Sequence, residues 1–138
     1  GEAAGMPNVH VLPRVSAELA HAISLHSDVN IVSMKDGPLM RVTMPSKVQS
    51  CLAAGRPILV HGAGDAADAV VRARAGLACM PSDQVGIRTR ILELGSMPQC
   101  ERERMGERAR AEFVKHYTEE VVGDKLEQLL AAALAGAR

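Results

Sequence analysis

The residues best placed to do chemistry form one string, Pro45-Ser46-Lys47, at the start of a predicted helix. Ser46 and Gln49 fit a capping box, in which the serine hydroxyl and the glutamine amide satisfy orphan backbone N–H groups. Alternatively, Pro45 is the first helical residue and the cap precedes it, which leaves the Ser46 N–H and hydroxyl free. Both arrangements expose N–H groups and the positive end of the helix dipole, and Lys47 adds a full charge. The string is compatible with an anion site, although an ordinary capped helix is the commoner explanation of such a string.

Two buried strands must hold this helix in place. Residues 28–34 and 57–60 are nearly continuous apolar runs, as expected of strands that are buried on both faces. Between them an apolar stripe recurs at helical spacing and faces the sheet. This stripe consists of Val48, Cys51 and Leu52. Gly55 suits the left-handed end of the helix and Pro57 forbids its continuation, so the region predicts a βαβ unit.

Further strands and helices alternate along the chain. We expect additional strands at 8–12 and 76–80, a helix capped by Ser16, one that opens after the His61-Gly-Ala-Gly64 turn, and one capped by Ser82-Asp83. The predicted fold class is therefore α/β: a doubly wound, Rossmann-like parallel sheet of about four strands with flanking helices.

The chain changes character at Pro98. The segment 101–115 alternates charges around a narrow apolar stripe, as in a solvated helix with one packed face. Thr118 then caps a final helix. The apolar stripe of this final helix consists of Val122, Leu126, Leu129, Leu130 and Ala133. We expect one domain over 1–138, with the sheet unit at 1–97 and two C-terminal helices at 98–138.

Composition excludes several classes of function. Lysine plus arginine and aspartate plus glutamate number 16 each, so no overall field recruits nucleic acid or anionic lipid. Phe113 and Tyr117 are the only aromatic residues, too few for a platform on which bases stack. The three cysteines share no metal or redox spacing, which suits a reducing cytoplasm, and no histidine is interpreted as a metal ligand. The glycines at 62 and 64 lack the third glycine of a dinucleotide fingerprint, which disfavours an oxidoreductase.

A longer stretch around the central helix resembles a known family. It reads VTMPSKVQSCLAAGRPILV, with SDVNIVSMKDGPL before it and AGLACMPSD after it, and resembles the donor-binding domain of GT-B glycosyltransferases. Its PSK and LAAG-x-P strings resemble the retaining family 4 of bacterial enzymes that build lipopolysaccharide, exopolysaccharide or capsule. The later string RERMGERARAEFVKHYTEEVVGDKLEQLL is similar to the closing helices of that family. The resemblance covers nearly the whole chain, and the order of its pieces is specific although no single piece is.

The resemblance implies a function and a set of site residues. A glycosyltransferase of this kind moves a sugar from a nucleotide-diphospho-sugar to a cell-surface polysaccharide or lipid-linked acceptor. The donor would lie across the carboxyl ends of the strands. Residues 12–14, including Arg14, would lie near the base. The diphosphate would lie near Thr43, Ser46 and Lys47, and the sugar near Lys35, Asp36 and Gly37. Catalysis would be electrostatic, because donors aimed at the departing phosphate stabilise its developing charge; neither a metal nor a cofactor is expected.

Two positions depart from the family pattern. The glutamate that commonly binds the nucleotide ribose is replaced by Ser50. A second acidic residue, near the donor sugar, falls at Val42, although Asp36 on the longer loop is a possible replacement. These departures keep open an alternative function, a non-catalytic module that binds a nucleotide or another effector.

The resemblance also implies that parts of the enzyme lie outside this chain. We expect a missing N-terminal acceptor domain, peripheral membrane association of the full enzyme, and no sugar transfer by the isolated chain. Two strands of the donor domain are missing as well, so the strand at 8–12 is expected to dock beside 28–34 through a right-handed crossover. The sheet would then contain its four strands in chain order.

Overall fold

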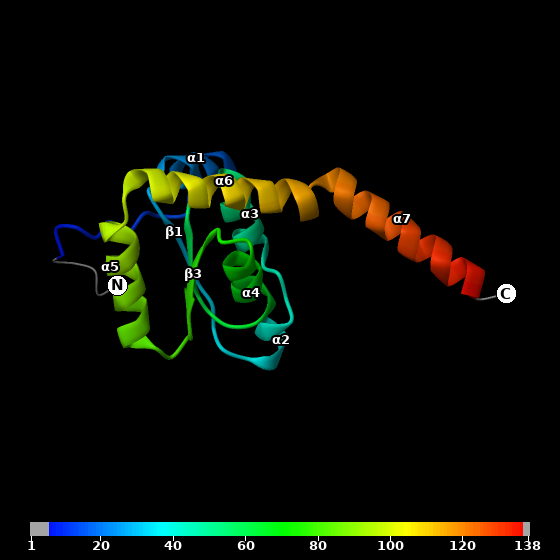
Figure 1. Ribbon diagram of the computed structural model, residues 1–138, viewed down its shortest axis with the longest axis horizontal. Coiled ribbons are helices and arrows are strands. Elements are labelled where there is room, and N and C mark those ends of the chain that lie inside the picture. The colour runs from blue at the N-terminus through cyan, green and yellow to red at the C-terminus, as the bar shows by residue number, and fades with distance from the viewer. Residues whose placement is uncertain (1–5, 137–138) are drawn as a thin grey trace.

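A computed structural model describes residues 6–136 and contains a three-stranded parallel sheet flanked by helices (Figure 1). The strands are β1 (Asn30–Ser33), β2 (Ile58–His61) and β3 (Gly76–Cys79), in the order β1-β2-β3. The helices are α1 (Ala17–His26), α2 (Pro38–Arg41), α3 (Ser46–Ala54), α4 (Asp65–Arg72), α5 (Gln84–Ser96), α6 (Gln99–His116) and α7 (Glu119–Gly136). The predicted α/β class and the parallel, Rossmann-like arrangement are confirmed, and the expected range 1–138 extends beyond the described residues at both ends.

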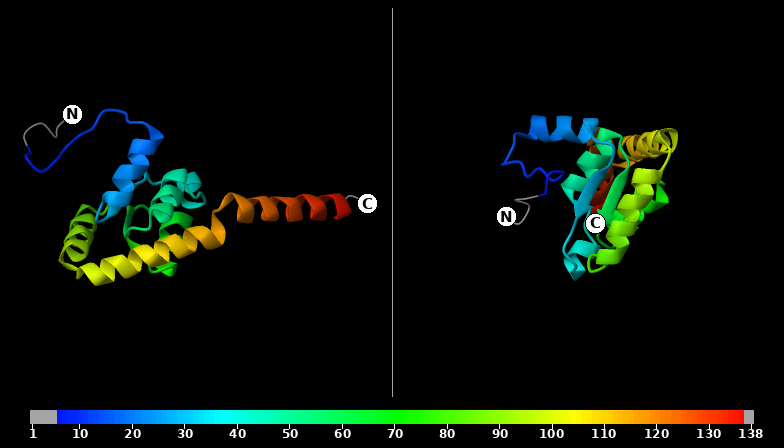
Figure 2. Two further views of the ribbon diagram at one scale, coloured as in Figure 1. Left: turned by 90° about the horizontal axis from the view of Figure 1, so that it is seen from above. Right: turned by 90° about the vertical axis from the view of Figure 1, so that its left-hand side faces the viewer.

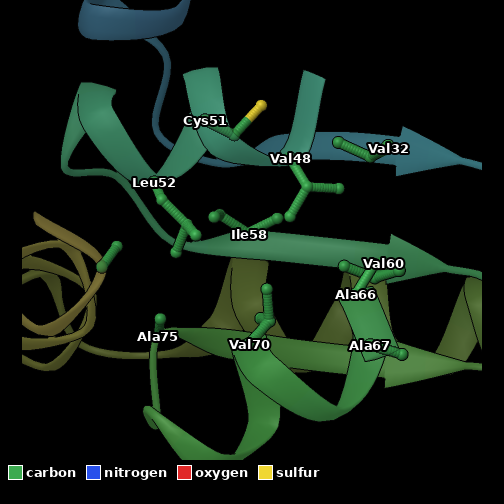
Figure 3. Close-up of a cluster of buried hydrophobic side chains, with 11 residues drawn as sticks. Val32, Val48, Cys51, Leu52, Ile58, Val60, Ala66, Ala67, Val70 and Ala75 are labelled. Atoms are coloured by element: carbon green, nitrogen blue, oxygen red, sulfur yellow. The ribbon is translucent and has the colours of Figure 1, made fainter. Parts of the chain in front are cut away.

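The core lies between the sheet and the two helices α3 and α4 (Figure 3). Strand β2 is central, and its Ile58, Leu59 and Val60 are fully buried. From α3 and α4, Val48, Leu52 and Val70 pack against the sheet with no exposed surface. Helix α5 contacts β2 and β3. Burial of these aliphatic side chains contributes roughly 1.5–3 kcal/mol for each large one, which makes this layer the stable centre of the molecule.

Helix α3 has the form predicted for it. Its buried residues include Val48, Cys51 and Leu52, the predicted stripe, and Gly55 ends it in the left-handed conformation with φ of 65°. Helix α6 crosses α3 at close range, because Gly106 lies against the Gly55 carbonyl and has no side chain to hold the two apart. Sequence patterning thus sufficed for the βαβ unit, whose strands differ from the predicted ranges only at their ends.

The prediction of a strand at 8–12 is wrong. Residues 8–16 have no regular structure, and Val9, Val11 and Leu12 are exposed. Among the described residues, the only backbone hydrogen bond that involves residues 8–12 runs from Val9 N–H to the Met6 carbonyl, 3.1 Å away. A strand exists only where its N–H and C=O groups pair with a neighbour, and this five-residue segment finds none. The sheet therefore has three strands instead of four, and β1 lies at its edge.

The terminal helices form as predicted but bury less than expected. Ser16 caps α1, since its hydroxyl oxygen accepts from Leu19 N–H at 3.2 Å, and Thr118 likewise accepts from Val121 N–H at 3.3 Å. Helix α1 buries none of its side chains in the described structure. Helix α7 projects away from the sheet (Figure 2), and its leucines at 126, 129 and 130 are more than half exposed. Local capping determines where these helices begin. Their apolar stripes, however, are not packed against other elements as the sequence pattern predicted.

Candidate functional site

The candidate site lies at the carboxyl edge of the sheet, where the connections after β1 and β2 meet. The β1–α3 connection contains the short helix α2, which the sequence analysis took for loop. The β2–α4 connection touches it, because a Cβ atom on Gly64 would clash with the Arg41 backbone. Gly64 has a φ of 89°, a conformation that L side chains rarely adopt. The second glycine of the Gly-x-Gly string is thus explained by this close packing.

The start of α3 differs from both predicted caps. Pro45 is the N-cap, with φ of −62° and ψ of 140°, and within residues 6–136 no side chain caps this helix. The Pro45 carbonyl accepts from Val48 N–H at 2.9 Å and from Gln49 N–H at 3.3 Å. The Gln49 amide donates instead to the Met44 carbonyl at 3.3 Å, so it does not close a capping box. The described residues supply no acceptor to the N–H groups of Ser46 and Lys47.

A groove of about 330 Å³ runs beside this helix start, between α1 and α3. It is lined by Ala17, Ala20, His21 and Ser24 on one side and by Ser46, Lys47, Ser50 and Cys51 on the other. The structure therefore brings together Ser46, Lys47 and Ser50 of the predicted site. The Ser50 hydroxyl donates to the Ser46 carbonyl at 3.0 Å, which leaves its oxygen able to accept a hydrogen bond.

The α1 wall of this groove was not predicted. Two bonds fix its position: the Asn30 amide donates to the Ser24 carbonyl at 3.2 Å, and Arg56 Nε donates to the Leu25 carbonyl at 2.7 Å. Both donors lie outside α1, so no pattern within the α1 sequence indicates where it docks. His21 and Ser24 are the two polar residues of this α1 wall, and the sequence analysis named neither as a site residue.

The predicted residues near the sugar lie apart from this groove. Asp36 and Arg41 form a bidentate ion pair, with Nε–Oδ1 at 2.9 Å and Nη2–Oδ2 at 3.0 Å. These hydrogen bonds lower the pKa of the Asp36 carboxyl. Both residues, with Gly37 and Pro38, line a separate surface hollow of about 390 Å³. Arg41 thus fixes the Asp36 carboxylate and uses one lone pair on each of its oxygens.

Three further predicted residues have simpler surroundings. Thr43 Oγ1 donates to the Leu39 carbonyl at 2.9 Å, which closes the end of α2. Lys35 is exposed at the end of β1, and Arg14 is exposed in the irregular N-terminal segment. Neither Lys35 nor Arg14 lines the α1–α3 groove. The structure therefore does not place the whole predicted set around one cavity.

A polar pair at the same edge escaped the sequence analysis. Ser33 and His61 end neighbouring strands in register, and Ser33 Oγ lies 3.0 Å from His61 Nδ1. His61 Nε2 is buried, and nothing in the described part of the chain forms a hydrogen bond with it. The only available signal was that a polar residue closes each of two consecutive apolar runs.

Metal and thiol chemistry find little support here. In residues 6–136, no group of three or more His, Cys, Asp and Glu side chains is arranged to hold a metal ion. Burial raises the pKa of the Cys51 thiol at the base of the groove, which disfavours the reactive thiolate. Burial is also the first cause of the raised pKa of Cys79. No helix among the described residues is long and apolar enough to cross a membrane.

No protein-family model, curated protein or solved structure matches this chain.

Proposed function

We propose that this chain is the donor-binding part of a retaining glycosyltransferase. It would help to move a sugar from a nucleotide-diphospho-sugar to a cell-surface polysaccharide or lipid-linked acceptor. The observation that carries the proposal is the start of α3, where two N–H groups that find no acceptor among residues 6–136 adjoin Lys47. This helix start belongs to the same PSK and LAAG string that resembles the sugar transferases.

In this proposal the diphosphate of the donor lies against Ser46 and Lys47. Free N–H groups at a helix start and the positive end of the dipole both favour a phosphate. The adjoining groove, about 330 Å³, falls at the small end of the ~300–1,000 Å³ range of ligand pockets, so it has room for part of a nucleotide. When the bond between sugar and diphosphate breaks, the same donors stabilise the charge that develops on the departing phosphate.

In this proposal, another part of the enzyme binds the acceptor. Transfer requires the donor and acceptor to be held in one orientation, and the α1–α3 groove supplies surfaces for only one of them. An acceptor domain of the same enzyme would provide the second surface, and peripheral contact of that enzyme with the membrane would bring a lipid-linked acceptor to it.

A second candidate function, nucleotide binding without transfer, has a specific observation in its favour. Asp36, the acidic residue available near the sugar position, is occupied by Arg41 in a bidentate pair. Ser50 at the ribose position offers one hydroxyl oxygen where the family has a carboxylate. Both changes weaken recognition of hydroxyl groups, whereas the anion site at the start of α3 is unaffected.

Calorimetric titration with a panel of nucleoside diphosphates tests the anion site. We expect Lys47→Ala to weaken binding by ~1.5–3 kcal/mol, the usual contribution of a charged hydrogen bond. The amide resonances of Met44 and of residues 46–48 should shift on binding in the unmodified chain. Lys125→Ala removes the same charge from the exposed helix α7 and serves as the matched control.

The outcomes of this titration are distinct. Equal affinities of the unmodified chain and Lys47→Ala would remove Lys47 from the site. Loss of affinity in Lys47→Ala but not in Lys125→Ala supports an anion site at α3. If diphosphates bind without preference for any nucleoside, and an attached donor sugar does not raise the affinity, the result favours the second candidate function.

A further inference from the structure

No carboxylate lines the groove between α1 and α3. Helix α3 contains no acidic residue, and Glu18, the only acidic residue of α1, lies outside the groove lining. Lys47 does line it, and its ammonium group has no acidic partner among residues 6–136. Burial raises the pKa of the Cys51 thiol, so this residue adds no negative charge to the groove. A group that enters the groove therefore meets a positive charge that the described chain leaves uncompensated.

The carboxylates on the other side of α1 belong to a separate cavity. Glu103 and Glu107 of α6 line a hollow between α1 and α6, and neither lines the α1–α3 groove. His21 lines both cavities. The acidic side chains of α6 and the lysine of α3 thus face different spaces.

Most polar groups in the lining of the groove are hydrogen-bond donors. The ammonium of Lys47 supplies three donors, and the His21 ring offers an N–H in either tautomer. Ser24 accepts through its carbonyl from the Asn30 amide, and its hydroxyl forms no hydrogen bond within residues 6–136. Ser50 differs, because its hydroxyl already donates to α3 and offers only its oxygen to a ligand. A group that accepts hydrogen bonds and carries negative charge fits these surroundings better than a sugar hydroxyl does.

The groove extends beyond the position proposed for the diphosphate. Ser50 lies four residues after Ser46, which corresponds to about 6 Å along a helix axis. We propose that this part of the groove binds a second anionic group of the same ligand, about one helical turn from the diphosphate. The inference rests on the proposed function, because the diphosphate of the donor is the first anion.

Two sources supply such a group. A nucleotide-diphospho-uronic acid carries a carboxylate on its sugar, and a nucleotide with a phosphorylated ribose carries a phosphate on its nucleoside. In dinucleotide-binding folds an acidic residue binds an unmodified ribose, whereas a basic residue accommodates a ribose phosphate. A groove with Lys47 and without a carboxylate follows the second pattern. Both sources share one chemistry, an anion that accepts several hydrogen bonds.

Calorimetric titration of the full chain with two matched ligand pairs tests this proposal. UDP-glucuronic acid differs from UDP-glucose by a carboxylate on the sugar. Guanosine tetraphosphate, with a diphosphate at each of two ribose positions, differs from GDP by an anionic group on the ribose. In one of the pairs, we expect the more highly charged member to bind about tenfold or more tightly, as a charged hydrogen bond would give. The pair that shows this gain identifies the source of the anion.

Substitutions in the groove should remove the gain. Ser50→Glu places a carboxylate beside the second anion, so both members of the pair should then bind equally or the more highly charged one more weakly. Ser24→Ala removes a free hydroxyl from the α1 wall and should reduce the gain by a factor of about three or more. Gln84→Glu adds the same charge at the exposed start of α5 and, as the matched control, should keep the gain. Circular dichroism shows whether each variant is folded.

The possible failures of the two proposals differ. If none of the four ligands binds, or if Lys47→Ala leaves their affinities unchanged, the diphosphate site is wrong and the second anion falls with it. If GDP and UDP-glucose bind through Lys47 but neither charged counterpart gains affinity, only the second anion site is overturned. A gain that persists in Ser50→Glu, or that Gln84→Glu abolishes equally, would also overturn it.

Discussion

Helices α3 and α4 begin under the same architectural conditions but differ in chemistry. Each follows a strand of the same parallel sheet, packs on the same face and starts at its carboxyl edge (Figure 1). The first turn of α4 contains Asp65 and Asp68. The first turn of α3 contains no acidic residue and includes Lys47. Both helix dipoles attract negative charge, and only at α4 does the chain supply that charge itself.

The difference shows how one fold position serves either packing or binding. At α4, Gly64 lies against the Arg41 backbone, which places protein where a ligand would have to approach. At α3, Pro45 offers no side-chain acceptor, so the first N–H groups remain available beside the groove. The glycine-rich turn before α4 superficially suggests phosphate binding. Of the two helix starts, however, it is the one that is packed against protein.

The largest effect should follow from Gly64→Ala, which tests the packing at the α4 start. The new Cβ atom would meet the Arg41 backbone, and the left-handed φ would be strained as well. We expect the free energy of unfolding to fall by ~1–3 kcal/mol from strain at φ alone, with displacement of α2 adding to this. Urea denaturation followed by circular dichroism measures the loss.

Gly95→Ala provides the control for that measurement. Gly95 lies within α5, and nothing in the described structure comes within 4 Å of a Cβ atom placed there. This variant should be as stable as the unmodified chain or gain up to ~1 kcal/mol from better helix propensity. If Gly64→Ala is equally well tolerated, the β2–α4 turn is not locked against α2.

An exchange of charge between the two helix starts should give an intermediate effect. Ser46→Asp places a carboxylate in the first turn of α3, where it should raise stability by ~0.3–1 kcal/mol. The same carboxylate should weaken binding of nucleoside diphosphates, because it occupies the proposed anion site and repels the negatively charged diphosphate. Asp65→Asn should lower stability by a similar amount and leave binding unchanged. Urea denaturation measures the stability of each variant, and calorimetry measures its affinity for nucleoside diphosphates. An unchanged affinity in Ser46→Asp would contradict the proposed anion site at α3.

The smallest effect concerns the ion pair in the connection between β1 and α3. Hydrogen bonds from Arg41 lower the pKa of Asp36, so this pair contributes stability above the carboxyl's unfolded pKa and loses it as pH falls through the lower folded value. Both partners are exposed at the surface, so the contribution to stability is slight. In Arg41→Ala, the Asp36 carboxyl should titrate at higher pH, as measured by carboxyl carbon NMR. An unchanged titration midpoint would show that the pair does not persist in solution.

The sequence alone predicted the elements around α3 because their signals are local. The short apolar runs at 28–34 and 57–60 are typical of buried strands. The spacing of the stripe of Val48, Cys51 and Leu52 is that of a helix. Capping by Ser16 and Thr118 was likewise predictable, since each cap involves atoms within three residues. Of the candidate site, the resemblance led us to expect Ser46 and Lys47 near the diphosphate and Ser50 near the ribose, and the three lie together because they share one helix.

Properties that depend on distant partners were not predictable in this way. The segment at 8–12 has strand-like composition, yet a strand requires a neighbour, and only the assembled fold shows that none is paired with it. The pairing of Ser33 with His61 depends on the register of two strands. Asp36 and Arg41 are only five residues apart, but their pairing depends on helix α2, which the sequence analysis did not predict. The α1 wall of the groove is set by Asn30 and Arg56, which lie outside that helix.

The sequence by itself determined the α/β class, the βαβ unit and the charge at the start of α3, because hydrophobic period, caps and side-chain charge act over a few residues. The tertiary structure decided which polar groups are already paired, which wall closes the groove and which edge of the sheet stays open. These depend on contacts between segments far apart in the chain, whose hydrogen bonds are satisfied only once the elements have packed.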